Sequence, residues 1–276
     1  MNEEQQFSRA LFLARKKQWT ALETYLQQSK KAARYDDINP KDPETSLNIL
    51  MMACKESKRG IIEILLDLAV DVNVQTRDGM TALHYAAASC PDIIVENLLK
   101  AGAQTTVQGG PMKQLPLHIA CKRHSIALII AKLLLKKMPK DARLVTDSSG
   151  SLPLTYAVET SNAGLVSLLL AEYAKEQAAD WRDNETGNCH IHLAANKGDH
   201  KMVQILVGLG FADVNAQNKF GQTAFHIAAI KRDMTLAKML HSLKASADII
   251  DKVGRILFTF CSIFIAFFRM NKQHCI

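Results

Sequence analysis

A short segment recurs along the chain at a nearly constant interval, and this repetition constrains the fold more than any other feature. Each copy places an alanine two residues after a shared position, which is held by His84, His118, Thr155, His192 and His226. That position recurs after 34, 37, 37 and 34 residues, and a fainter copy lies at residues 50–53. Chains with such a period form stacked units that bury their apolar faces against one another. A single central core is therefore not expected.

The residues around the shared position indicate which unit is repeated. In two copies a threonine precedes the histidine by three residues, at Thr81 and Thr223. A T-x-L-H-x-A pattern with a period near 33 resembles the ankyrin repeat, over about residues 44–254. The resemblance implies an all-α ankyrin-repeat solenoid of helix-turn-helix units with connecting fingers, in about six repeats. We predict an N-terminal helical cap and loop at 1–43, repeats at 44–77, 78–111, 112–148, 149–185, 186–219 and 220–254, and an apolar non-repeat tail at 255–276.

Composition and cysteine usage favour an intracellular protein-binding chain. The net charge is +7, and residues 5–35 hold seven cations against the single Glu23. We interpret this charge as a solvated helix face rather than an anion-binding surface, because no nucleic-acid motif accompanies it. The six cysteines show no C-x-x-C spacing, and Cys54 and Cys121 follow the repeat alanine, as expected of reduced core residues. No signal sequence opens the chain, so we expect it not to be secreted.

The repeated histidines invite a metal or catalytic interpretation, above all at Cys189–His192. Their recurrence favours a structural role, because a ligand cluster would occur once. We expect Thr81, His84, His118, His192, Thr223 and His226 to bond backbone groups at the start of each first helix. Thr155 lacks the ring, which puts the network of its repeat in question. No catalytic or phosphate-binding motif is found, so we predict no cofactor, no metal and no enzymatic activity.

Basic residues recur just after several first helices, at Lys55, Lys122, Arg123, Lys197, Lys231 and Arg232. Comparable offsets in four repeats would place them along one edge of the stack. Solvated turn residues are one interpretation, and a surface for a protein partner is the other.

The segments that flank the motifs resemble a particular family. Residues 221–229, 238–240 and 242–247, together with 202–207, 213–218, 152–159 and 13–19, are similar to the N-terminal ankyrin region of NOMPC-type (TRPN) mechanosensory channels of the TRP superfamily. The resemblance implies the cytoplasmic tether of a cation channel, attached to the membrane through a longer product, with cytoskeletal proteins as candidate partners. Full-length members are homo-oligomeric channels, and we expect this chain to be an N-terminal fragment without the pore and the remaining repeats. The alternative is a free-standing cytosolic ankyrin adaptor.

The tail departs from the repeat pattern. Residues 256–268 are thirteen mostly apolar positions between Arg255 and Arg269. As a helix they would span about 20 Å, against a hydrocarbon core of about 30 Å. We therefore expect the tail not to form a stable membrane span.

Overall fold

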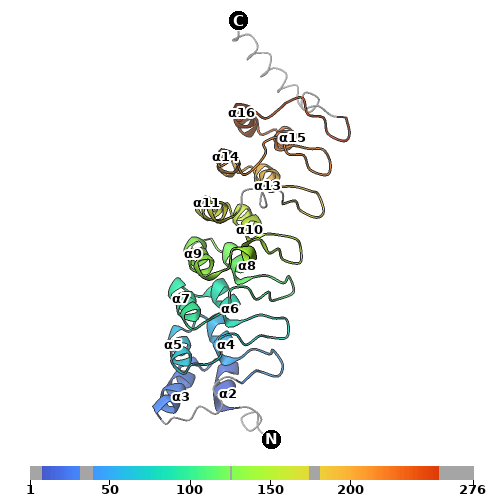
Figure 1. Cartoon of the computed structure of the whole chain (residues 1–276). Helices are drawn as coiled ribbons and strands as arrows, with labels where there is room; N and C mark the ends of the chain where they lie inside the picture. The colour runs from blue at the N-terminus through green and yellow to red at the C-terminus, as the bar shows by residue number, and fades with distance from the viewer. Residues whose placement is uncertain (1–7, 32–39, 125, 174–180, 255–276) are drawn as a thin grey trace. The chain divides into compact units, whose positions relative to one another are not determined.

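The computed structural model describes residues 8–31, 40–124, 126–173 and 181–254 (Figure 1). The chain divides into two compact units, residues 1–148 and 149–276, and each is described by itself. Among the described residues the regular structure is helical, apart from one antiparallel bridge between Gly109 and Gln114. The predicted all-α class is confirmed. In the same residues no helix has the length and apolarity needed to cross a membrane.

Unit 1 is a stack of helix pairs. Its first helices are α2 (Arg9–Arg15), α4 (Ile49–Lys55), α6 (Ala82–Ser89) and α8 (Pro116–Cys121). Its second helices are α3 (Trp19–Lys31), α5 (Arg59–Asp67), α7 (Asp92–Lys100) and α9 (Ala127–Lys137), followed by the 3₁₀ turn η1 (Asp141–Leu144). Each first helix contacts the next first helix, and each second helix contacts the next second helix. The expected cap, α2 and α3, is thus a helix pair of the same kind as those that follow.

Unit 2 repeats this arrangement. Its first helices are α10 (Pro153–Glu159), α13 (His190–Lys197) and α15 (Ala224–Ile230), and its second helices are α11 (Ala163–Glu172), α14 (His200–Gly208) and α16 (Met234–Ser242). Helix α13 contacts both α10 and α15, as α14 contacts both α11 and α16. The tail 255–276 lies outside the described residues, and the predicted repeat boundaries remain predictions.

Small residues allow the first helices to approach one another. The repeat alanines Ala53, Ala86, Ala120, Ala157, Ala194 and Ala228 are all fully buried. Cys54 and Cys121 are buried and form no disulfide, as expected, and burial raises the pKa of Cys121. The second helices bury one aliphatic face, for example Ile94, Val95 and Leu98 in α7.

The fingers between helix pairs also pack closely. The backbone N–H of Gly110 donates to the Asp78 carbonyl of the preceding finger at 2.9 Å. Gly79 has φ +87°, and a Cβ placed on it would lie 2.8 Å from the Gln108 carbonyl oxygen. Only glycine combines this left-handed backbone with so close an approach.

Candidate protein-binding surfaces

The shared histidine bonds the backbone of its own repeat, and at His84 and His192 it also bonds the next finger. The N–H of Thr81 donates to His84 Nδ1 at 3.0 Å, while His84 Nε2 lies 3.0 Å from the Gln114 carbonyl oxygen. Because a backbone N–H only donates, Nδ1 accepts, and the ring proton therefore sits on Nε2 and is donated to Gln114. The imidazole is neutral and fully buried, and burial lowers its pKa.

The other histidines occupy the same place. The N–H of Cys189 donates to His192 Nδ1 at 3.2 Å, and His192 Nε2 lies 2.9 Å from the Gln222 carbonyl oxygen. His118 and His226 accept from the N–H groups of Leu115 and Thr223, at 3.1 and 3.2 Å respectively. These contacts are those expected of framework residues. Among the described residues no group of three His, Cys, Asp or Glu side chains is placed to hold a metal ion.

The repeat that lacks the ring is completed by its neighbour. The Thr155 hydroxyl accepts from the Leu152 N–H at 3.2 Å and lies 3.2 Å from His190 Nε2. His190 stacks on Trp181, with ring centroids 4.4 Å apart, and the indole N–H donates to the Gly150 carbonyl at 2.6 Å. Burial, and then the charge of Arg182, lowers the pKa of His190 to about 3. The repeat of Thr155 therefore has its own hydrogen-bond network, in which the threonine hydroxyl and His190 replace the shared histidine.

Three of the predicted partner-binding cations bond the preceding repeat. Lys197 Nζ donates to the Glu159 carbonyl, and Lys231 Nζ to the Asn196 carbonyl, each in the last turn of the preceding first helix. Arg123 Nη1 donates to the Cys90 carbonyl at 2.7 Å and to the Ala87 carbonyl at 3.3 Å. Carbonyls at a helix end have no partner within the helix, so these side chains supply one. We call Arg123, Lys197 and Lys231 the inter-repeat cations.

The remaining cations of that set are arranged differently. Lys122 Nζ donates to the Gln114 side-chain oxygen of its own repeat at 2.9 Å. Arg232 is an exposed turn residue with φ +58°. Lys55 lines a cleft of about 270 Å³.

This cleft, the first groove, lies between the N-terminal helix pair and the first finger of unit 1. Its apolar part comes from Ala14, Trp19, Leu47 and Met52, and its charged rim from Arg15, Lys17, Asp42, Glu44, Lys55 and Glu56. Lys17 bonds Glu56 at 2.9 Å across the rim, and this hydrogen bond lowers the pKa of the Glu56 carboxyl.

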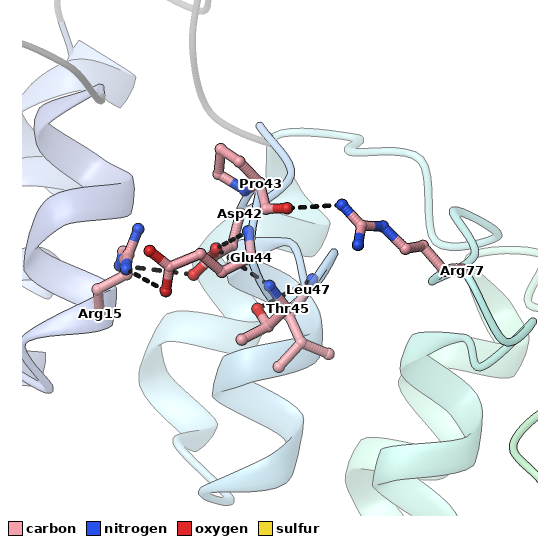
Figure 2. Close-up of polar contacts among 7 residues, drawn as sticks. All are labelled: Arg15, Asp42, Pro43, Glu44, Thr45, Leu47 and Arg77. Carbon is pink, nitrogen blue, oxygen red and sulfur yellow. Dashed lines mark hydrogen bonds and ion pairs between the residues drawn. The ribbon is translucent and has the colours of Figure 1, made fainter.

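The finger wall of the first groove is held by an internal network (Figure 2). Arg15 bonds Glu44 at 2.8 Å and lies 3.5 Å from the buried Asp42 carboxylate. Asp42 also accepts from the N–H groups of Glu44 and Thr45, at 2.8 and 3.2 Å. From the next finger, Arg77 donates to the Pro43 carbonyl at 2.8 Å. Sequence reasoning did not find this wall, because the Pro-rich loop around Asp42 gave only a turn signal.

Family models now decide what this arrangement is. A model of ankyrin repeats in three copies matches residues 11–109 and 94–180, and a model of multiple ankyrin repeats matches residues 191–241. The chain belongs to the ankyrin repeat family. The ankyrin match begins within α2, so the N-terminal helix pair falls inside the family pattern.

Individual ankyrin relatives agree with this assignment. Ankyrin repeat protein L371 of Acanthamoeba polyphaga mimivirus is 26% identical over 66% of this chain and 23% of its own length. Palmitoyltransferase AKR1 of Debaryomyces hansenii is 29% identical over 79% of this chain and 27% of its own length. The chain therefore spans about a quarter of each relative. The crystal structure of the Bcl-3 ankyrin repeat domain matches 77% of this chain and 92% of that one, with TM-score 0.66 and 24% identity, and shows the fold.

Ankyrin repeats mediate protein–protein interactions, and the fold is typically non-catalytic. The described chain is thus a protein-binding ankyrin domain. The names of these three relatives describe no ion channel, so the finer resemblance to NOMPC-type channels is taken up as a proposal.

Proposed function

We propose that this chain binds a protein partner without catalysing a reaction, and that the first groove is one of its contact sites. The observation that carries this proposal is the groove itself, because Trp19, Leu47 and Met52 offer apolar surface inside a rim of charged side chains. Binding sites of this kind combine an apolar floor with a few polar groups that fix orientation. The role of Lys55 is then to contact the partner, unlike that of the inter-repeat cations.

Photo-cross-linking from the groove tests this proposal. A benzoylphenylalanine at position 55 is expected to give one discrete protein adduct in extracts of the source organism. The same group at Glu63, on the exposed outer face of α5, serves as the matched control. The adduct partner, once purified, should bind the wild-type chain and lose affinity for Trp19→Ala. Equal adducts from both positions, or an undiminished affinity of Trp19→Ala, contradict the groove assignment.

The finer proposal concerns the protein to which the array belongs. We propose a tether of a mechanosensory TRP-type channel, on the cytoplasmic side of the membrane, with cytoskeletal partners and a homo-oligomeric full-length product. The resemblance of the flanking segments supports it, together with the mechanics of a stack in which force passes from neighbour to neighbour. The alternative is a free-standing cytosolic adaptor, which the ankyrin family assignment supports equally.

Transcript sequencing separates the two. Further repeats and six membrane spans in frame after Arg255 are expected for the tether. A stop codon after residue 276 in full-length transcripts is expected for the adaptor. Force extension of the isolated array adds a mechanical test. A tether should release single repeats of about 33 residues, or about 12 nm of contour length each, and recover them on relaxation.

A further inference from the structure

The second helix of the fourth pair, α9, carries a net positive charge, unlike α5 and α7. On α5, Arg59 bonds Glu63 at 2.7 Å, and on α7, Lys100 bonds Glu96 at 2.9 Å. Both are pairs at i and i+4, so the one basic residue of each helix has an acidic partner on the same helix. Helix α9 contains three lysines and no acidic residue. It also has 11 residues where α5 and α7 have 9, and the last two are Lys136 and Lys137.

These lysines lie on an exposed face that also includes apolar side chains. Ile129, Lys132, Leu133 and Lys136 follow one another at helical spacing, and we call them the α9 stripe. Lys132 and Lys136 are exposed, Leu133 is half-buried, and Ile129 is 47% exposed. Among the described second helices of unit 1, no other large hydrophobic side chain is exposed to this degree.

The end of α9 does not depend on its lysines. Buried Arg143, from η1, donates to the Leu135 carbonyl at 3.1 Å and to the Met138 carbonyl at 3.4 Å. The carbonyls that a basic residue of the last turn would ordinarily bond thus have a guanidinium partner. Lys136 and Lys137 remain at the surface, and the charge of Lys136 contributes only a small part of the lowered pKa of Glu96, after that of Lys100.

We propose that the α9 stripe binds an acidic amphipathic helix of a partner protein. This inference rests on the proposed protein-binding function and names a partner class for it. The lysines supply complementary charge for Glu or Asp side chains, and Ile129 and Leu133 supply apolar surface for one or two aliphatic residues.

The surroundings of the stripe favour a helix over a membrane. Glu96 of α7, the second helix that contacts α9, and Glu63 and Asp67 of α5, which contacts α7 in turn, are at least partly exposed. Each of these two helices carries two carboxylates against one basic residue. A flat anionic bilayer that approached Lys132 and Lys136 would also approach these carboxylates. A single helix about 10 Å wide can lie along α9 and approach fewer of these carboxylates.

Fluorescence anisotropy with a labelled synthetic peptide tests the proposal on the full chain. The probe is a helix of about 15 residues with Leu and Glu at helical spacing, and its counterpart carries Gln for Glu. The acidic peptide is expected to bind with an affinity that falls as salt rises, and the Gln peptide to bind at least about tenfold more weakly. Lys132→Gln/Lys136→Gln should weaken the acidic peptide about tenfold, and Ile129→Ser about threefold.

Two matched variants complete the design. Lys132→Arg/Lys136→Arg should retain binding, because it keeps the charge. Lys201→Gln/Lys252→Gln removes two exposed lysines from unit 2 and should change the affinity by less than about twofold. Circular dichroism confirms that each variant is folded.

Several outcomes overturn the proposal. It is wrong if the acidic peptide binds wild type and Lys132→Gln/Lys136→Gln equally, or if the Gln peptide binds as tightly as the acidic one. It is also wrong if phosphatidylserine vesicles bind the chain through these lysines while the peptide does not. Cross-linking from position 55 is independent of α9, so a failure of the first groove and a failure of the stripe are distinguishable.

Discussion

Removing one framework histidine should cost more than a lost helix cap. His84→Ala deletes a fully buried ring that accepts from the Thr81 N–H at 3.0 Å and bonds the Gln114 carbonyl at 3.0 Å. The first contact lies within the repeat and the second reaches the next finger. Loss of the helix-start bond alone would cost about 1–2 kcal/mol. The structure adds the bond to the Gln114 carbonyl, which keeps its other partner, the Gly109 N–H at 2.9 Å.

The magnitude follows from these two groups. The Thr81 N–H left without a partner costs about 1–3 kcal/mol, the lost Gln114 bond about 0.5–1.5 kcal/mol and the residual cavity about 1 kcal/mol. The helix preference of alanine offsets about 0.5 kcal/mol of this loss. We therefore expect His84→Ala to lower the free energy of unfolding by about 2–5 kcal/mol.

Two further variants divide the effect between the ring nitrogens. Asn places an acceptor near the position of Nδ1, so His84→Asn should keep the Thr81 bond and lose the Gln114 bond. Gln places a donor near Nε2, so His84→Gln should do the reverse. Urea denaturation followed by circular dichroism gives the stability of each variant. Hydrogen exchange at the Thr81 amide reports the local bond, which matters because a repeat array need not unfold in one step.

Two results would refute this reasoning. One is a His84→Ala variant whose stability lies within about 0.5 kcal/mol of wild type, since surface-like substitutions have effects of that size. The other is a Zn²⁺-dependent stabilisation of wild type that His84→Ala abolishes, which would make the ring a ligand.

Three other predictions follow from described contacts. The pKa of His190 is about 3 in the folded chain and about 6.5 in the unfolded chain, so protonation favours unfolding as the pH falls below 6.5. Urea denaturation should therefore show about 2 kcal/mol less stability at pH 5 than at pH 7.5. His190→Asn should remove this pH-dependent loss of stability. Gly79→Ala should lower the free energy of unfolding by at least about 2 kcal/mol, because its methyl group clashes with the Gln108 carbonyl. Gly102 also has a positive φ, +88°, but a Cβ placed on it would meet no atom within 4 Å, so Gly102→Ala should cost about 1 kcal/mol in the same assay. Lys231→Met should lower stability by about 1 kcal/mol and speed hydrogen exchange in α13, and unchanged exchange would contradict its role as an inter-repeat cation.

The periodic part of this structure was predictable from the sequence. A residue type that recurs every 33 to 37 positions has the same structural role in every unit, and the stacking of the units requires that role. The histidine contacts follow from this reasoning, as do the buried cysteines. The role of Thr155 did not follow, because the side chain that completes its repeat is His190, which lies 35 residues further on.

The inter-repeat cations show a different limit. Their offset was visible in the sequence, but their acceptors are backbone carbonyls, which every residue has. A pattern of lysines therefore could not distinguish a surface that awaits a partner from one that bonds its own neighbour. The first groove was hidden for another reason. Its walls come from residues 14–19, 42–47 and 52–56, which only the packing of α2 against α4 brings together.

These cases separate two kinds of residue in the array. Arg123, Lys197 and Lys231 recur at comparable offsets, and their contacts hold successive repeats together. Trp19 in the first groove and the lysines of α9 occur once, in the N-terminal helix pair and in a second helix longer than α5 and α7. Stacking imposes the same demands on every unit, so it does not explain residues found in only one. A binding site for a partner, in contrast, occupies only one part of the surface. We therefore expect the partners of this chain to bind at the residues that are not repeated.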